Sequence, residues 1–198
     1  MSNQLILNKK IVNNDWVFLL PVIEQKEVKK QAGKVVMFKV TGENFPEDDD
    51  LNKIKLPDVS KILLPLKLYL LRKDEIEKKY SEVGLWVYSH EDFQWLLNLN
   101  LDLNKFSVIG IYIEKFADGR IYSLGNLIRR KLKFKNDLRA LGDILKDQLF
   151  FLDRSGFSSF LIKEGRSAEE AIKGLSDFSH SYQATLDEIP SWRKNLNG

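Results

Sequence analysis

The sequence predicts an α/β protein built around a mainly parallel sheet. From residue 59 onward, five short apolar runs alternate with longer amphipathic segments, and polar turns containing Gly, Asp or Ser separate them. Such alternation is typical of parallel strands joined by right-handed helical crossovers. We therefore expect about five consecutive βα units, in an open sheet or a partial TIM-like barrel, and an N-terminal β-hairpin before them. A complete barrel would need eight such units.

The N-terminal region, residues 1–41, carries the hairpin signal. Two apolar runs are separated by Asn13, Asn14 and Asp15, residue types that tolerate a tight turn. We predict strands over 5–12 and 16–20. The β-branched residues of 34–41 predict another strand. The polar stretch at 24–31 fits either a short exposed helix or a loop.

Residues 42–58 predict a solvated loop, because they combine two prolines, an acidic run and an Asn-Lys pair. A metal-binding acidic loop is the alternative. The three consecutive aspartates at 48–50 lack the alternating spacing that a calcium loop requires.

The βα core is predicted over residues 59–180, and a polar tail over 181–198, within a single domain covering 1–198. The five expected strands lie at 61–65, 84–89, 107–113, 138–141 and 158–162. A helix is expected after each of them. Ser89 is the predicted N-cap of the second helix and Ser167 that of the last one.

Composition excludes several classes of chemistry. The chain has no Cys, so it offers no disulfide, thiolate nucleophile or cysteine-ligated cluster. Its two histidines, His90 and His180, are too few and too far apart to predict a metal site. No apolar run is long enough to span a membrane, and a net charge of +3 is too small to predict nucleic-acid binding. We expect a cytoplasmic protein with no metal.

The turns after the predicted strands contain the candidate ligand-binding residues. The carboxyl ends of parallel strands share one edge of a sheet, where helix N-termini also favour anions. The candidates are Asp118, Gly119, Arg120, Tyr122, Ser123, Arg139, Gly142, Asp143 and Lys163, with His90, Gly165 and Arg166 from neighbouring turns. Charged and polar groups of these types suit a small anion. The alternative is that Asp118 and Asp143 only cap helices and that the glycines only shape turns.

A basic segment lies between residues 117 and 139. It contains seven basic residues, namely Arg120, Arg129, Arg130, Lys131, Lys133, Lys135 and Arg139, against two acidic ones, Asp118 and Asp137. This excess is typical of a solvated helix face. It also fits a docking patch for an acidic protein, for which Arg129, Arg130 and Lys133 are the candidates. An aromatic stacking platform interleaved with these basic residues is missing, which argues against nucleic acid.

Three sequence runs resemble a known family. FADGRIYSLGNLIRR, LRALGDILKDQLFFLDRSGFSSF and LSDFSHSYQ resemble the bacterial domain-of-unknown-function family 934, strongly over 84–183 and weakly around the N-terminal NDW. The pattern is carried by Asp118, Gly119, Arg120, Tyr122, Ser123, Arg139, Gly142, Asp143, Asp147, Gln148, Gly156 and Phe157. The chain departs from it at Ile121, where the family tends to have Gly, and at Ser155, where it tends to have Cys. The insert around 25–57 looks long for the family.

The resemblance implies a role in assimilatory sulfite reduction, since members are described as putative oxidoreductases encoded beside the sulfite reductase hemoprotein. It supplies no catalytic residue. We expect an accessory protein that binds that hemoprotein, or a small anion such as sulfite or sulfate, at the carboxyl-terminal edge of the sheet. The alternative is an oxidoreductase that borrows a flavin or nicotinamide. No GxGxxG phosphate-binding loop follows a predicted strand, so neither cofactor is specified by the sequence.

Overall fold

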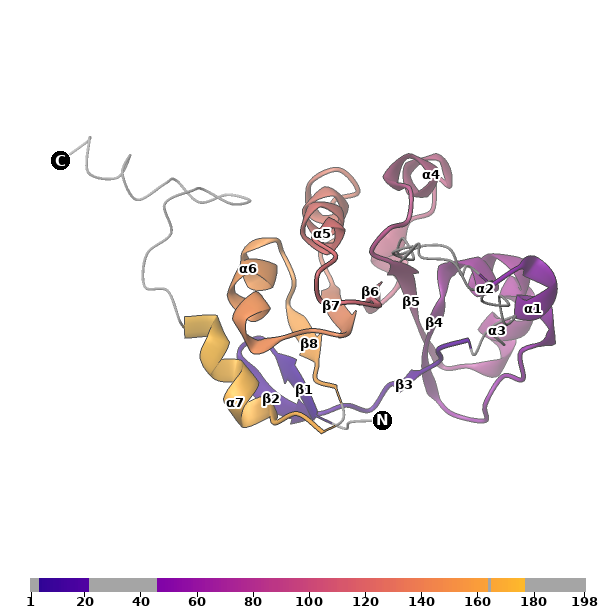
Figure 1. Cartoon of the computed structure of the whole chain (residues 1–198). Helices are drawn as coiled ribbons and strands as arrows, with labels where there is room; N and C mark the ends of the chain where they lie inside the picture. Colours follow the sequence, from indigo (N-terminus) through magenta and orange to yellow (C-terminus); the bar gives the residue numbers. More distant parts are fainter. Residues whose placement is uncertain (1–3, 22–45, 164, 177–198) are drawn as a thin grey trace, which may run out of the picture.

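The computed structural model, which describes residues 4–21, 46–163 and 165–176, contains one eight-stranded sheet covered by helices (Figure 1). The strands are β1 (Gln4–Leu7), β2 (Lys10–Asn13), β3 (Val17–Phe18), β4 (Lys61–Pro65), β5 (Glu82–Tyr88), β6 (Val108–Ile113), β7 (Asp137–Gly142) and β8 (Ser159–Leu161). Their order in the sheet is β2-β1-β8-β7-β6-β5-β4-β3. Strands β3 to β8 run parallel, whereas β1 is antiparallel to both β8 and β2. The protein is therefore an α/β protein with a mixed, mostly parallel sheet.

The helical segments follow the parallel strands, and all of them except α7 and η3 lie between two such strands in the chain. They are α1 (Asp48–Lys53), α2 (Leu66–Leu71), α3 (Lys73–Lys79), α4 (Phe93–Asn98), α5 (Arg120–Arg130), α6 (Leu149–Arg154) and α7 (Ala168–Lys173), with short 3-10 turns η1 (Leu103–Lys105), η2 (Lys146–Gln148) and η3 (Gly174–Ser176). No helix in the described ranges has both the length and the apolar character that crossing a membrane requires.

The connection between β2 and β3 shows that the sheet is curled. These strands occupy opposite edges of the sheet, yet only residues 14–16 separate them in the chain. A flat sheet of eight strands would place its edges about 34 Å apart, given a spacing of about 4.8 Å between neighbours. The connection from Asn13 to Val17 can span at most about 14 Å. The sheet must therefore bend back toward itself.

Side chains on the two faces of the sheet form two separate hydrophobic clusters. On β5, Leu85 and Val87 belong to the large core beneath the helices, whereas Trp86 and Tyr88 point to the other face. Strand alternation produces this division, since successive side chains point to opposite sides. The second cluster contains Trp16, Phe18, Leu63, Trp86, Tyr88, Val108 and Leu141, all from strands or from the residue just before β3. The inner, helix-free face of the curl is thus filled by strand side chains.

The predicted N-terminal hairpin is wrong in its position. A hairpin exists, but it joins β1 to β2 through Asn8 and Lys9, both of which have positive φ angles as a tight two-residue turn requires. The expected second strand does not pair with it. Instead, β3 lies parallel to β4 at the far edge of the sheet. Asn13 ends β2, and Asn14 and Asp15 belong to the connection between the two edges rather than to a hairpin turn.

The expected loop over 42–58 is wrong over residues 48–53. Residues Asp48–Lys53 form α1, which the aspartates begin and which buries Leu51 completely. Carboxylates in the first turn of a helix interact favourably with the positive end of the helix dipole. The acidic run therefore stabilises the start of α1. The strand and polar stretch expected between 24 and 41, and the tail over 181–198, lie outside the described residues.

The later strands lie close to their expected positions, although several helices differ. The segment after β4 divides into α2 and α3 at Arg72. The second helix begins later than expected, because Asp92 and not Ser89 is the N-cap of α4. Ser167 does cap α7, by accepting a hydrogen bond from the backbone N–H of Glu170. Since β3 adds a parallel strand ahead of β4, the sheet is larger than a series of five units.

Candidate functional site

The carboxyl ends of the parallel strands β5, β6, β7 and β8 lie side by side. We call these strand ends, together with the residues that directly follow each strand, the rim. The four strands are parallel and directly paired in this order. The rim therefore gathers the residues at 89–92, 114–119, 143–148, 162–163 and 165–167. Most of the candidate ligand-binding residues belong to these turns or to the first turn of the following helix.

Asp118 anchors the turn after β6. Its carboxylate accepts hydrogen bonds from Arg120 Nε at 2.8 Å, from Arg120 Nη2 at 2.9 Å, and from the backbone N–H of Arg120 at 3.1 Å. Ser89 Oγ, at the end of β5, donates a further bond of 2.7 Å. The Asp118 side chain is only 5% exposed, whereas that of Arg120 is 47% exposed. A buried carboxylate thus holds a guanidinium that solvent can reach.

The hydrogen bonds decide the ionisation of Asp118. Burial alone would raise its pKa, but the bonds from Arg120 and Ser89 lower the pKa of Asp118 to about 2. The carboxylate is therefore charged at neutral pH. The bond to the Arg120 amide also stabilises the start of α5, so the capping interpretation of Asp118 is part of its role.

Asp143 anchors the turn after β7 with two cations. Its Oδ1 lies 3.2 Å from Lys163 Nζ and 3.0 Å from Arg166 Nη2, which both follow β8. Partial burial opposes the effect, but these two cations lower the pKa of Asp143. The side chains of Lys163 and Arg166 are 55% and 36% exposed. Two positive charges share one carboxylate, so the group formed by these three side chains carries a net charge of +1.

The turns after β6 and β7 are joined to each other. Gln148 Nε2 donates to the carbonyl of Phe116 at 2.7 Å, and its Oε1 accepts from the backbone N–H of Leu145 at 3.0 Å. The backbone N–H of Asp143 donates to the carbonyl of Ile113 at 3.0 Å. These bonds hold the two turns in fixed positions. Within the described residues, no hydrogen bond or ion pair joins Asp118 to Asp143 directly.

Gly142 is required where β7 leaves the sheet. Its φ angle is +96°, and a Cβ atom there would lie 2.1 Å from the carbonyl oxygen of Ile113. Gly119 differs, because a Cβ atom would meet nothing within 4 Å. Tyr122 is half-buried on α5, where burial raises its pKa despite the opposing effect of Gln148, and Ser123 is exposed. Of these four candidates, only Gly142 has a stringent backbone role.

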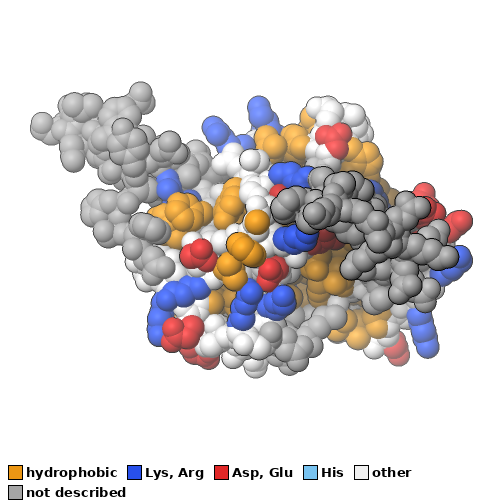
Figure 2. Space-filling model, in the orientation of Figure 1, with side chains coloured by type: hydrophobic (Ala, Val, Ile, Leu, Met, Phe, Trp, Pro, Cys, Tyr) orange, Lys and Arg blue, Asp and Glu red, His pale blue; other side chains and the backbone are white. Residues whose placement is uncertain are grey.

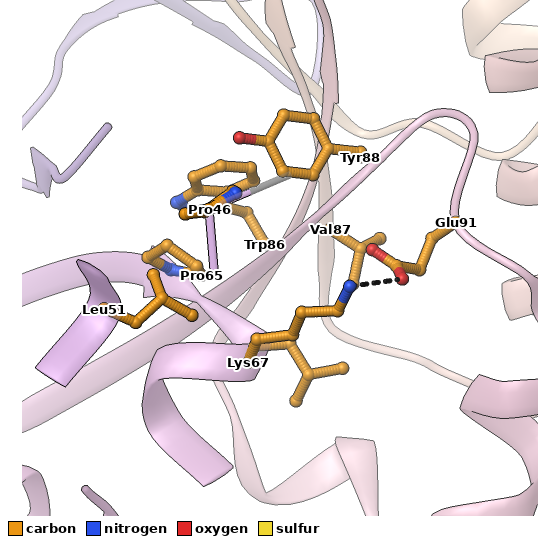
Figure 3. Close-up of a pocket in the computed structure, with 9 residues that line it drawn as sticks. Pro46, Leu51, Pro65, Lys67, Trp86, Val87, Tyr88 and Glu91 are labelled. Carbon is orange, nitrogen blue, oxygen red and sulfur yellow. Dashed lines mark ion pairs between the residues drawn. The ribbon is translucent and has the colours of Figure 1, made fainter. Parts of the chain in front are cut away.

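Three residues that were not among the predicted ligand-binding residues lie in or beside this rim. Lys67, at the start of α2, forms an ion pair of 3.3 Å with Glu91, whose side chain is only 9% exposed (Figure 3). Burial raises the pKa of Glu91, although Lys67 acts in the opposite direction. The pair borders a small pocket, of about 10 Å³, which is room for roughly one water molecule. Ser89 is the third residue, through its bond to Asp118.

His90 lies between these groups in the chain. Its ring stacks on that of Tyr88 with centroids 5.0 Å apart. Burial and the positive charges of Arg120 and Lys67 lower the pKa of His90, while Asp118 acts in the opposite direction. Ser89, His90 and Glu91 directly follow β5 in the chain. A run of three polar residues after a buried strand is the sequence signal that could have identified Ser89 and Glu91, as well as His90, as rim residues.

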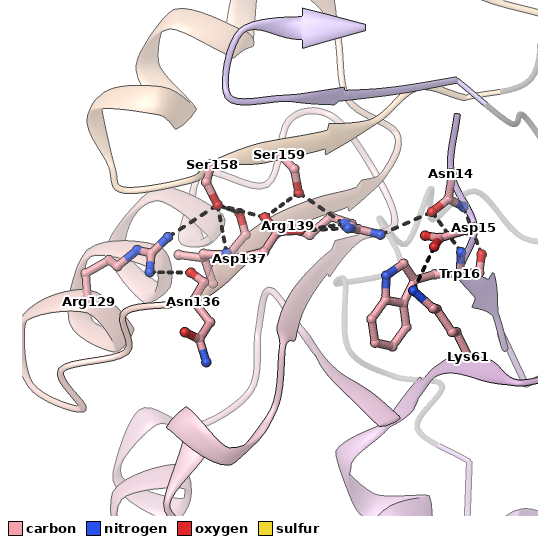
Figure 4. A network of polar contacts seen from close by, with 11 residues as sticks. Asn14, Asp15, Trp16, Lys61, Arg129, Asn136, Asp137, Arg139, Ser158 and Ser159 are labelled. Carbon is pink, nitrogen blue, oxygen red and sulfur yellow. Dashed lines mark hydrogen bonds and ion pairs between the residues drawn. The ribbon is translucent and has the colours of Figure 1, made fainter. Parts of the chain in front are cut away.

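Arg139 does not lie in the rim turns, although the sequence grouped it with them. It occupies the amino-terminal half of β7, points to the inner face and is 2% exposed. Its guanidinium forms an ion pair of 2.7 Å with Asp137 and donates to Ser159 at 3.0 Å (Figure 4). It also reaches Asn14 in the connection between β2 and β3. These contacts assign Arg139 to the packing of the sheet.

The predicted docking residues separate into two kinds. Arg129 turns inward and donates to the carbonyls of Gly156, Phe134 and Asn136 at 2.7 to 2.8 Å. Burial lowers its pKa. Arg130 and Lys133 are exposed. On the face seen in Figure 2, Lys and Arg side chains are interspersed with Asp and Glu rather than gathered in one patch.

Within the described ranges, no group of three or more His, Asp or Glu side chains is placed to hold a metal ion. The fold and the rim together define an α/β protein with a curled, mostly parallel sheet and a rim of anchored cations. The sequence signature of a family described as "Bacterial protein of unknown function (DUF934)" matches residues 84–192, which is more than half of the chain. The chain belongs to this family. No curated protein and no solved structure matches it.

Proposed function

We propose that the protein binds a small oxyanion, such as sulfite or sulfate, at the rim, and that it acts as an accessory protein of assimilatory sulfite reduction. The observation that supports anion binding best is the arrangement at Asp143, where two partly exposed cations share one carboxylate. The remaining positive charge is fixed in position before any ligand arrives. An oxyanion gains charge-assisted hydrogen bonds there at a low cost in side-chain ordering.

Arg120 provides a second oriented cation, in the neighbouring turn. Its guanidinium is oriented by Asp118 while almost half of its side chain stays exposed. The start of α5, which directs backbone N–H groups toward the rim, adds a favourable dipole for an anion. The assignment to sulfur metabolism rests on the family resemblance, as does the sulfite reductase hemoprotein as partner.

Thermal unfolding in sodium sulfate and in sodium sulfite tests this proposal, with sodium chloride of equal ionic strength as the control. A ligand present at 100 times its dissociation constant stabilises the folded protein by about 2.7 kcal/mol. For a chain of this length, that corresponds to a rise in Tm of roughly 5 to 10 °C. Arg166→Ala and Lys163→Ala should reduce the rise. Equal melting temperatures in all three salts would contradict the proposed binding of sulfate and sulfite.

A second candidate function is an oxidoreductase with a borrowed flavin or nicotinamide. It is favoured by the aromatic side chains of the inner face, where the ring centroids of Trp86, Tyr88 and Tyr112 lie 5.0 to 5.9 Å apart. Planar cofactors stack well on such rings. However, Trp86 and Tyr88 are 1% and 7% exposed, so stacking would require them to be uncovered. An absorbance spectrum of the protein after incubation with flavin, then desalting, tests this candidate.

A further inference from the structure

A second charged surface lies at the opposite end of the strands from the rim. Residues 130–135, which we call the basic loop, end α5 and precede β7, and residues 102–106 precede β6. Because β6 and β7 are parallel neighbours, with Val108 paired to Asp137, these two connections meet at the amino-terminal ends of the strands. A strand of six residues is about 20 Å long, so roughly that distance separates this surface from the rim.

Side chains on both sides hold the backbone of the basic loop in place. Asn104 Nδ2 donates to the carbonyl of Lys133 at 3.3 Å, and Asn104 Oδ1 accepts from the backbone N–H of Lys135 at 2.9 Å. From the helix side, Arg129 Nη1 donates to the carbonyl of Phe134 at 2.8 Å. The loop therefore presents its side chains from a fixed backbone, which lowers the ordering cost of binding a partner.

The two connections expose five cations and one carboxylate, Asp102, which leaves an excess of four positive charges. The cations are Lys105, Arg130, Lys131, Lys133 and Lys135. None of the five forms an ion pair with another residue in the described part of the chain. Their charges are therefore available to a partner.

Lys133 adopts a backbone conformation that lysine rarely takes. Its φ angle is +53°, in the left-handed region that Gly and Asn occupy at lower cost. Residues held in such conformations by their surroundings are commonly found where function needs a particular side chain. A lysine at this turn position therefore favours a role for its ammonium group.

We propose that the basic loop, together with Lys105, docks an acidic segment of a partner protein. Carboxylates of the partner would complement the excess of cations. Nucleic acid fits this surface less well, because bases stack on exposed aromatic rings, whereas Phe106 and Phe134 are only 7% and 2% exposed. A membrane fits less well, because no large hydrophobic side chain is exposed in residues 102–106 or 130–136.

The position of this surface separates docking from ligand binding. The rim lies at the carboxyl-terminal ends of the same strands, so a partner on the basic loop leaves it accessible. The inference concerns a second surface, and it stands whether or not an anion binds at the rim.

Fluorescence anisotropy with a fluorescein-labelled decaglutamate peptide tests the docking on the full chain. The wild type should bind the peptide, and more weakly as sodium chloride is added, because salt screens exposed charges. Combining Lys131→Gln, Lys133→Gln and Lys135→Gln should lower the affinity by about tenfold, as expected for the loss of three exposed ion pairs. No binding to the wild type would overturn the inference and leave anion binding at the rim untouched.

A matched control separates the loop from net charge. Combining Lys10→Gln, Lys53→Gln and Lys55→Gln removes the same number of exposed lysines from other parts of the surface. This variant should bind the peptide like the wild type. Equal losses of affinity in the two triple variants would show that the peptide responds to net charge alone, and would refute docking at the loop.

Lys133→Gly separates the side chain from the fold. Glycine adopts the left-handed conformation without strain, so the midpoint of urea denaturation should stay the same or rise while peptide affinity falls. Affinity at the wild-type level would exclude this side chain from the surface. An oligothymidylate of the same length as the peptide tests nucleic acid. If it bound more tightly than the peptide, and lost this binding in the loop variant, the partner would be a nucleic acid and the inference would be wrong.

Discussion

Arg139 Nη1 donates a hydrogen bond of 3.2 Å to Oδ1 of Asn14, a residue 125 positions away in the chain. Asn14 belongs to the three-residue connection between the outermost strands, β2 and β3, whereas Arg139 lies in the middle of the sheet. The next residue, Asp15, forms an ion pair of 2.9 Å with Lys61 on β4. The connection is thus bonded to both halves of the curled sheet.

Arg139→Ala should therefore be strongly destabilising. The substitution leaves Asp137 partly buried without its cation, a change that typically costs about 3–5 kcal/mol. Asn14→Ala removes one partner only and should cost about 1 kcal/mol. Urea denaturation followed by tryptophan fluorescence measures both values. If Arg139→Ala unfolded at the same urea concentration as the wild type, the buried network would have no structural role.

Gly142→Ala tests the backbone at the end of β7. The φ angle of +96° and the close approach of the Ile113 carbonyl should together cost about 1–3 kcal/mol or more. Gly119→Ala is the matched control, because this glycine has a φ angle of −69° and open space around it. Its free energy of unfolding should change by less than about 1 kcal/mol. Equal effects of the two substitutions would contradict the conclusion that Gly142, unlike Gly119, is required by the backbone conformation.

Asp118 should make stability depend on pH in the acidic range. Its pKa is lowered from 3.8 to about 2, so the stabilisation is fully present above pH 3.8 and is lost as the pH falls toward 2. The difference corresponds to about 2 kcal/mol. The free energy of unfolding of Asp118→Asn should decrease less steeply over this range than that of the wild type. Parallel curves for the two proteins would show that the hydrogen bonds do not hold the carboxylate in its charged form.

Substitutions at Arg129 and at its neighbours Arg130 and Lys133 should distinguish a structural role from a role in docking. Arg129→Ala removes a cation that donates to three backbone carbonyls, and we expect it to lower the free energy of unfolding by about 2–4 kcal/mol. Arg130→Glu combined with Lys133→Glu changes only exposed charges. The double substitution should leave the midpoint of urea denaturation almost unchanged. Co-purification of the sulfite reductase hemoprotein, which we propose as the partner, with the double variant then tests the docking patch directly. Retention of the partner at the wild-type level would exclude these two residues from docking.

The strands after residue 60 could be predicted from sequence because each is a local apolar run, and burial on both faces of a parallel sheet requires such runs. The pairing of Asp118 with Arg120 is also local and lies within one turn. By contrast, the partners of the N-terminal strands could not be predicted. The Asn-Asn-Asp run favours a turn by its residue types, but the choice between a hairpin and a connection across the sheet depends on strands more than forty residues away.

The roles of individual arginines were the least predictable part. Arg129 and Arg130 are adjacent on α5, yet one is turned toward carbonyls of two following loops and the other is exposed. Helical position alone does not reveal this difference, since long side chains can reach polar groups beyond their own face. Similarly, Arg139 is surrounded by apolar residues in the sequence, and only the curl of the sheet brings Asn14 to its guanidinium.

The position of a bound anion tests the central claim most directly. Crystals soaked in selenate, an analogue of sulfate, would reveal the anion by the anomalous scattering of selenium. The account predicts a peak within hydrogen-bonding distance of Arg120, or of Lys163 and Arg166, and loss of that peak when the contacted cation is replaced by Ala. Selenate that occupies only sites away from these three side chains, or that binds nowhere, would contradict it.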